Sequence, residues 1–232
     1  MVQSLTTWVP GAIGIDETSP TKNPAHADYY QALKKGEKPN PHAFKSQLFF
    51  LFDSLTQALE VEARMVEAPI FWGGSPWHHF MYVHLLHEES ILSEEDYERY
   101  CAILIQCLPL IPHPIGGIHT RRKTGDDTRL AVKSRAERSV GEEKARRMDE
   151  TGVPIEYWQS QIAYWEIREA TGLLLPKEVD EKLGEHSPKI PIVTFDPDEI
   201  DWLTKNGQGE SISNGEGKQE ILGQLVAALV NS

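Results

Sequence analysis

Two short motifs decide where this chain can begin a helix. Asn40-Pro41 and Ser75-Pro76 each place a capping side chain before a proline, an order typical of the first turn of an α-helix. After Asn40-Pro41, apolar residues recur at helical spacing until Pro69 interrupts the segment. These residues are Phe44, Leu48, Leu51, Phe52, Leu55 and Leu59. The sequence therefore predicts a long helix from about residue 41 to 68 and a second helix over 76–89.

The same reasoning predicts several further helices and little strand. Ser93 is followed by three acids, which favours a helix from there to about Leu108. Other segments with helical character are 25–35, 154–170, 177–183 and 198–205, and Ile190 to Phe195 is the one segment with strand character. We therefore expect a mainly α fold: an irregular helical bundle with an extended N-terminal arm, long loops and at most a minor β-strand pair.

Composition along the chain suggests how it is organised. Residues 1–24 are rich in Pro, Gly, Ser and Thr, and residues 206–217 resemble a flexible linker. We expect an arm over 1–24, a helical core domain over 25–205 with a basic insertion at 119–150, the linker, and a C-terminal helix over 218–232. Because an arm and a short tethered helix need a surface to dock on, we expect partner contacts through Trp8, Leu222, Leu225 and Leu229.

The basic insertion stands out in an acidic protein. The chain has a formal net charge of −12, yet residues 119–147 carry a clear excess of Lys and Arg over Asp and Glu. Three interpretations stay open: a solvated helix whose charges pair with one another, contact with phosphate, or docking on an acidic protein surface. The candidate contact residues for phosphate or an acidic partner are Arg121, Arg122, Lys123, Arg129, Lys133, Arg135, Arg138, Arg146 and Arg147.

Histidines and aromatic residues form two further groups of candidate functional residues. His84, His87 and Glu88 lie three or four residues apart, so a helix would put them on one face as candidate ligands for a divalent metal; the alternative is a polar core seam. Rings around Gly73-Gly74, among them Trp72 and Trp77, either fill a tight turn or line a ligand pocket.

Known catalytic motifs find no match in the sequence. There is no Gly-x-Ser-x-Gly elbow, no Gly-x-x-x-x-Gly-Lys phosphate loop and no dinucleotide-binding fingerprint. Cys101 and Cys107 are six residues apart in an apolar segment, which favours two free thiols in a reducing compartment.

These observations favour a protein that works by contact. We expect a non-enzymatic structural or assembly subunit of a larger complex, of viral or nucleoprotein type, with no cofactor. Its partners would be other protein subunits or a second copy, with a nucleic-acid backbone as an alternative and no membrane. The rival hypothesis is a metal-dependent enzyme built on the His/Glu cluster of 76–89. Because the chain lacks a long apolar run and a signal-peptide pattern, we expect a cytoplasmic location, or one within a particle assembled inside the cell.

Overall fold

The computed structural model describes most of the chain. The described residues are 6, 9–138, 141, 151–153, 155–183, 189–195, 203–205, 211–213, 220, 223–224 and 226–227. The chain forms two compact units. The first unit contains Met1–His113 and Leu175–Ser187, and the second contains Pro114–Leu174 and Pro188–Ser232.

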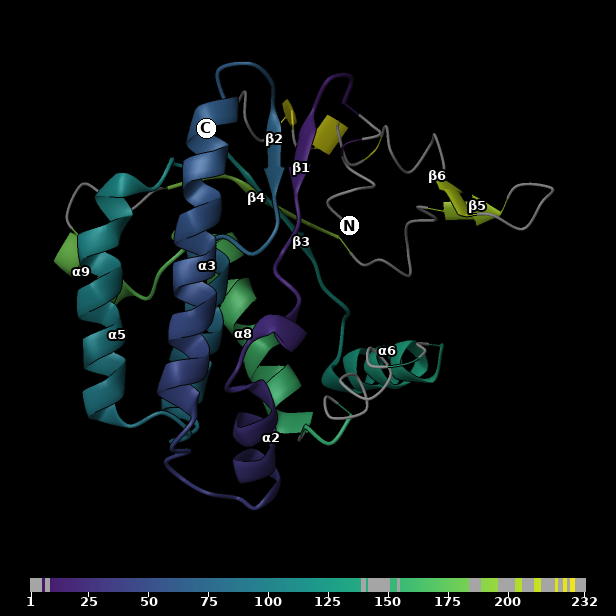
Figure 1. Ribbon diagram of the computed structural model, residues 1–232. Coiled ribbons are helices and arrows are strands. Elements are labelled where there is room, and N and C mark those ends of the chain that lie inside the picture. Colours follow the sequence, from purple (N-terminus) through teal and green to yellow (C-terminus); the bar gives the residue numbers. More distant parts are fainter. Residues whose placement is uncertain are drawn as a thin grey trace. The chain divides into compact units, whose positions relative to one another are not determined.

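The first unit is a helical layer beside a short parallel strand pair (Figure 1). Strand β1 (Ile13–Ile15) pairs with β2 (Ile70–Trp72), so that Ile15 lies opposite Trp72. Between them in sequence come the 3-10 helix η1 (Pro20–Lys22), α2 (His26–Lys34) and the long α3 (Ala43–Arg64). After β2 come α4 (Pro76–Glu88), α5 (Glu94–Cys107) and η2 (Leu108–Leu110), and α9 (Lys177–Leu183) returns to this unit.

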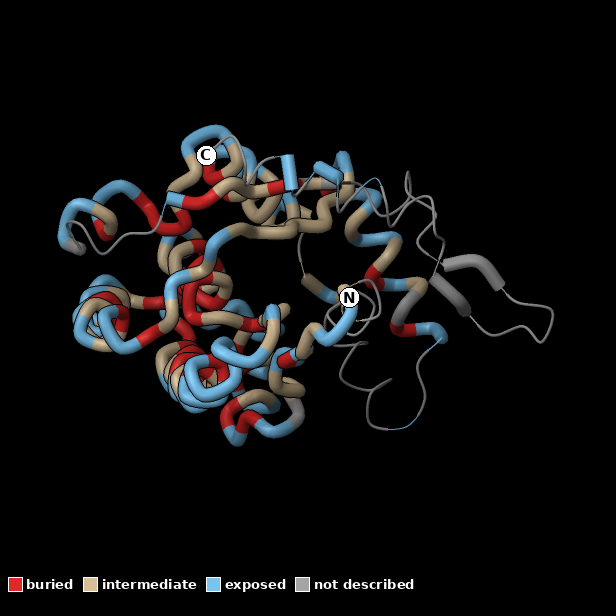
Figure 2. Tube along the Cα trace, turned by 90° about the horizontal axis from the view of Figure 1, so that it is seen from above, coloured by how far each residue is buried: buried red, intermediate tan, exposed pale blue. Residues whose placement is uncertain are grey.

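Helix α4 lies at the centre of the first unit's core. Eight of its 13 residues are buried, the pattern of a helix that is covered on nearly all sides. Its Phe80 and Val83 are fully buried, and so are Leu51 on α3 and Leu104 on α5. Figure 2 shows buried residues along one side of the outer helices and exposed residues along the other. Ser75 caps α4 by accepting a hydrogen bond from the backbone N–H of His78, as the Ser-Pro motif predicts.

The second unit contains its own parallel pair. Strand β3 (Gly117–Thr120) pairs with β4 (Ile192–Phe195), and α8 (Ile155–Thr171) packs on β4 while α6 (Gly125–Arg138) packs on α8. Tyr164 on α8 donates a hydrogen bond from its hydroxyl to Leu174 O at 3.1 Å. An antiparallel pair joins β5 (Leu203–Lys205) to β6 (Ser211–Ser213).

The predicted mainly helical character is confirmed, and the predicted strand content is too low. The described part of the chain has three strand pairs, two of them parallel, where at most one minor pair was expected. Within the predicted arm Ile13–Ile15 form β1, and within the predicted linker Ser211–Ser213 form β6. The predicted helix over 198–205 is wrong at Leu203–Lys205, which form β5.

Two other features of the described residues bear on the predictions. Cys101 and Cys107 are free thiols, and Cys101 is buried. Within the described ranges, no helix combines the length and the apolar character needed to span a membrane.

Candidate functional site

The carboxyl ends of β1 and β2 carry polar residues that α3 holds in place. Thr18 donates a hydrogen bond from its hydroxyl to the carboxylate of Asp53 on α3. Gln57 Nε2 donates to Asp53 Oδ2 at 2.9 Å and to Thr18 Oγ1 at 3.2 Å, while Gln57 Oε1 accepts from Trp72 Nε1 at 2.8 Å. Both strands are thereby joined to one helix. Ligands of parallel α/β sheets bind at this carboxyl end of the strands.

A tight glycine turn continues β2 into α4. Gly74 has a φ of +75°, a backbone conformation that side chains disfavour. A Cβ at this position would lie 2.9 Å from Cγ and 3.1 Å from Cα of Glu17. Ser54 on α3 donates a hydrogen bond to Gly74 O at 2.8 Å. The turn is therefore packed between Glu17 and α3, and it brings a carboxylate close to the start of α4.

Two neutral histidines follow this turn at the start of α4. His79 is 4% exposed, and burial lowers its pKa from 6.5 to about 3, with His78 lowering it further and a hydrogen bond to the Gly74 backbone opposing. Burial also lowers the pKa of His78, and Glu17 opposes that shift. The ring of His79 stacks on Phe50 of α3, with centroids 5.3 Å apart and planes 21° apart. Tyr82 makes an edge contact with His78 at 5.5 Å. Flat rings from α3 and α4 thus meet in one cluster.

Gln47 lies one turn before Phe50 on α3, and its side-chain amide is available for a hydrogen bond. It is only 7% exposed, yet among the residues that the structure describes it has no hydrogen-bond partner. Its neighbour Ser46 is bonded, because Asn23 Nδ2 donates to Ser46 Oγ at 2.9 Å. An amide that forms no hydrogen bond with the described residues can donate to and accept from a ligand. An amide one helical turn from stacked rings suits a flat heteroaromatic molecule.

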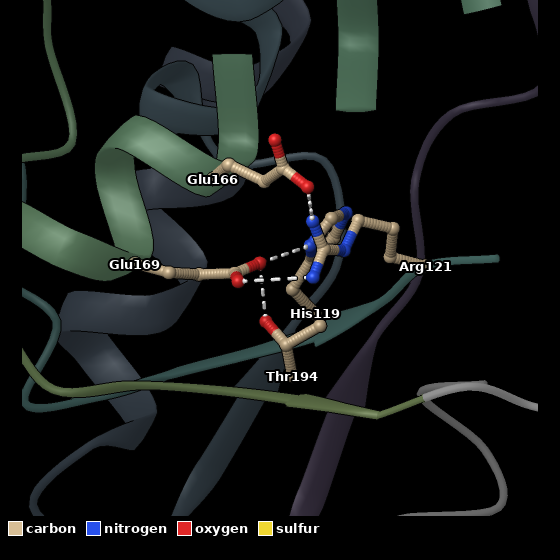
Figure 3. A network of polar contacts seen from close by, with 5 residues as sticks. All are labelled: His119, Arg121, Glu166, Glu169 and Thr194. Carbon is tan, nitrogen blue, oxygen red and sulfur yellow. Dashed lines mark hydrogen bonds and ion pairs between the residues drawn. The ribbon is translucent and has the colours of Figure 1, made fainter. Parts of the chain in front are cut away.

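The second unit holds a separate polar network around Glu169 (Figure 3). Glu169 Oε1 accepts a hydrogen bond from Thr194 Oγ1 on β4 at 2.5 Å and lies 3.3 Å from His119 Nδ1 on β3. Arg121 pairs with Glu169 at 3.5 Å and with Glu166 at 2.7 Å. The His119 ring also stacks on Trp165 of α8, with centroids 4.3 Å apart. This network connects α8 to both strands of its sheet.

The structure places the predicted basic residues in different surroundings. Arg121 is engaged by the two α8 carboxylates, and Arg129 pairs with Asp126 at 3.1 Å. Lys123, Lys133 and Arg138 are exposed, and Arg122 is half-buried. The side chain of Arg135 and all of Arg146 and Arg147 lie outside the described residues. Contact between this segment and phosphate or an acidic partner stays a prediction.

The predicted metal ligands are not brought to a common point. His84 Nδ1 lies 3.1 Å from the hydroxyl of Tyr97 on α5, and His87 Nε2 pairs with Glu94 at 2.8 Å. The His87 ring stacks on Tyr97 at 4.1 Å, whereas Glu88 lies 3.9 Å from His87 Nδ1. Across the described ranges, no group of three or more His, Cys, Asp or Glu side chains could hold a metal ion. Residues of α5 occupy the face on which sequence spacing had placed a metal.

The structure describes the predicted aromatic residues Trp72 and Trp77 but not the predicted docking residues. Trp8, Leu222, Leu225 and Leu229 lie outside the described residues. Trp77 is 3% exposed and packs edge-on against His113, and Trp72 is bonded to Gln57.

Gln47, Phe50 and Asp53 were not predicted as site residues, because their positions fit an amphipathic helix. One weak signal was present, since a glutamine within the apolar stripe is unusual on a buried face.

Comparison with known proteins gives a likeness of fold. No family model matches the chain, and no curated protein matches its sequence. Among solved structures, the chain is similar to a deoxyadenosine kinase from M. mycoides that was solved with products dCMP and a flexible dCDP bound. The TM-score is 0.58 at 14% sequence identity, over 97% of this chain and 91% of that chain.

This likeness contradicts our prediction of a non-enzymatic structural or assembly subunit. That prediction depended on treating the arm and the terminal helix as appendages, but 97% of the chain is covered by a match to the fold of an enzyme. The expectation that the protein is not an enzyme is corrected for the same reason. The chain shares the fold of a deoxyadenosine kinase.

Proposed function

We propose that this protein is a nucleoside-kinase-like enzyme that binds a nucleoside in its first unit, between α3 and the start of α4. The observation that carries the proposal is Gln47, a 7% exposed residue one helical turn before Phe50, whose ring stacks on His79. The fold likeness to a deoxyadenosine kinase supports the substrate class.

Gln47 is suited to recognising the base. A glutamine amide presents one donor and one acceptor side by side, the pattern that adenine completes with its N6 amino group and N7. Cytosine offers the same adjacent pattern through its N4 amino group and N3. The rings of Phe50 and Tyr82 supply faces on which a base stacks, and such stacking is worth roughly 1–3 kcal/mol per base. The proposed substrate is therefore a nucleoside of adenine or cytosine.

Carboxylates at the end of β1 are suited to activating the sugar hydroxyl. Asp16 and Glu17 follow β1 directly and are exposed, whereas Asp53 is already bonded to Thr18 and Gln57. In the proposed reaction, one of the two carboxylates accepts the hydroxyl proton while the hydroxyl oxygen bonds to the terminal phosphorus of a nucleoside triphosphate. The bond from that phosphorus to its bridging oxygen breaks, and the nucleoside diphosphate leaves.

The triphosphate of the phosphate donor needs positive charge to bind, and this chain lacks the glycine-rich phosphate loop that often supplies it. Because the sequence has no Gly-x-x-x-x-Gly-Lys motif, the proposal assigns the charge of the triphosphate to a divalent cation that enters with it.

A transfer assay tests the proposal. The purified protein is incubated with MgATP and each of the four deoxynucleosides, and monophosphate is quantified by chromatography. We expect deoxyadenosine or deoxycytidine monophosphate from the unmodified protein, and a loss of at least about a hundredfold in the variant that lacks the true base, Asp16→Asn or Glu17→Gln. Binding without any product would overturn the transfer step, and neither binding nor product would overturn the whole proposal.

A further inference from the structure

Gln57 on α3 bonds to the chain on both sides of Glu17. Its Nε2 donates to the backbone oxygen of Asp16 at 3.3 Å and to Thr18 Oγ1 at 3.2 Å. These two residues are the immediate neighbours of Glu17, just after the carboxyl end of β1. Hydrogen bonds to both neighbours of a residue restrict the backbone movement of that residue. Glu17 is therefore fixed in position although the residue is exposed.

The amide of Gln57 has one orientation, which its other contacts determine. Gln57 Oε1 accepts from Trp72 Nε1 at 2.8 Å, and Nε2 also donates to Asp53 Oδ2 at 2.9 Å. Asp53 in turn accepts the hydroxyl hydrogen bond of Thr18. Rotating the amide by half a turn would bring its NH₂ group against the indole N–H, so that two donors would face each other. The amide therefore links β2 rigidly to the residues around Glu17.

The Gly74 turn confines the side chain of Glu17 from another direction. A Cβ at Gly74 would lie 2.9 Å from Cγ and 3.0 Å from Cβ of Glu17, so this side chain lies directly against the turn that leads into α4. Burial lowers the pKa of His78 in the first turn of α4, and the carboxylate of Glu17 opposes that shift. The carboxylate is therefore close enough to the start of α4 to act on it.

We propose that Gln57 is a positioning residue, which fixes Glu17 so that its carboxylate faces the sugar hydroxyl of a bound nucleoside. The inference rests on the proposed function, and it selects Glu17 over Asp16 as the group that accepts the hydroxyl proton. Asp16 contributes its backbone oxygen to the contact with Gln57, whereas the side chain of Glu17 lies against the turn that opens α4. Gln57 acts through Glu17 and not on the substrate, because a base works only when its position is fixed to within about 0.5 Å.

Transfer kinetics with MgATP and deoxyadenosine or deoxycytidine test the positioning role. Gln57→Leu keeps the approximate size of the side chain and removes its hydrogen bonds, so we expect kcat to fall by about tenfold to a hundredfold. The Kd of the nucleoside, measured by calorimetry, should stay within about twofold, because the base-binding residues are unchanged.

Val61→Ala is the matched control for these kinetics. Val61 is buried one turn further along α3, so this variant also destabilises the first unit but leaves the contacts around Glu17 intact. Its kcat should equal that of the unmodified protein at a temperature where all variants are folded. An unchanged kcat in Gln57→Leu, or an equal loss of kcat in Val61→Ala, overturns the inference.

The titration of His78 gives a readout that does not depend on activity. Because the Glu17 carboxylate favours the protonated imidazole, Glu17→Gln should lower the pH midpoint of His78 measured by NMR. Gln57→Leu should lower it as well, because a released carboxylate moves away from α4. A midpoint that Gln57→Leu leaves unchanged overturns the inference. If the midpoint falls but the unmodified protein forms no monophosphate, the positioning of Glu17 by Gln57 is supported and the proposed phosphoryl transfer is overturned.

Discussion

Trp72 on β2 donates its indole N–H to Gln57 Oε1 on α3 at 2.8 Å, and this bond joins the parallel strand pair of the first unit to its longest helix. The other end of the Gln57 amide bonds to Asp53 and Thr18. Gln57 is thus fully bonded, whereas Gln47 on the same helix has no bonded partner among the described residues. This difference separates a structural glutamine from a candidate ligand-binding one.

Replacing Gln57 should destabilise the first unit. Gln57→Ala leaves the Trp72 indole without its partner and removes donors from Asp53 and Thr18, so we expect the free energy of unfolding to fall by about 2 kcal/mol. Urea denaturation measures the change. The control is Thr56→Ala, because Thr56 is exposed and bonds only within its own helix turn; its effect should stay within about 0.5 kcal/mol. Equal effects in the two variants would argue against the bridging role.

Replacing Gln47 should not destabilise the fold. Gln47→Leu removes an amide that makes no hydrogen bond in the described part of the chain and keeps an apolar side chain in a buried position, so the free energy of unfolding should stay the same or rise. Chemical denaturation without ligand measures it. A loss of about 2 kcal/mol or more would reveal a structural bond at this amide.

The Gly74 turn should not tolerate a side chain. Gly74→Ala places a residue at a φ of +75° and puts its Cβ 2.9 Å from Glu17 Cγ, so strain and collision together should cost about 2 kcal/mol or more. Gly36 has a φ of +71° but no atom within 4 Å of its would-be Cβ. Gly36→Ala therefore isolates the conformational cost of roughly 1 kcal/mol, and thermal denaturation of both variants measures the difference. Equal losses would mean that Glu17 moves aside freely.

His79 should make the stability of the first unit depend on pH. Its pKa is about 3 in the folded protein and 6.5 in its unperturbed state, so the unfolded chain binds the extra proton between these values. Its contribution to stability is complete above pH 6.5 and is lost as the pH falls towards 3, by at most about 1.4 kcal/mol per pH unit. His79→Phe keeps a ring against Phe50 and removes this titration. The free energy of unfolding of the unmodified protein minus that of His79→Phe should therefore rise as the pH increases from 3 to 6.5. A difference that does not change with pH would rule out this contribution of His79.

Glu169 should stabilise the second unit more than Glu166 does. Glu169 contacts His119, Arg121 and Thr194 and its side chain is 19% exposed, while Glu166 contacts Arg121 and is 60% exposed. We expect Glu169→Ala to lower the free energy of unfolding by about 2 kcal/mol and Glu166→Ala by less than about 1 kcal/mol. Hydrogen exchange at β3 and β4 would localise the effect. If Glu166→Ala lost more protection from hydrogen exchange than Glu169→Ala, the prediction would be contradicted.

The sequence predicted the helices well because their signals are local. Ser75-Pro76 and Ser93 mark starts, and Gly172, with a φ of +70°, marks an end. The parallel pairs escaped prediction because each strand has three or four residues and a distant partner: Ile13 pairs with Ile70, and Gly117 pairs with Ile192. A segment so short carries too little periodicity to be distinguished from a loop.

The candidate site could not be predicted from spacing alone. His84 and His87 do share a helix face, but Tyr97 of another helix lies against both rings. Phe50 meets His79 only because α3 and α4 pack together. The sequence pattern indicates an unpaired cation at Arg121, whereas in the fold Arg121 pairs with Glu166 and Glu169. Each of these relationships is tertiary and has no counterpart along the chain.

The most direct test of a nucleoside-binding first unit is calorimetric titration of deoxyadenosine and deoxycytidine into the unmodified protein and Gln47→Leu. We predict saturable binding of at least one of them, with a Kd between about 1 μM and 1 mM. Gln47→Leu should bind at least about tenfold more weakly while unfolding at the same denaturant concentration. Absence of binding by the unmodified protein, or equal affinity in Gln47→Leu, would contradict the account.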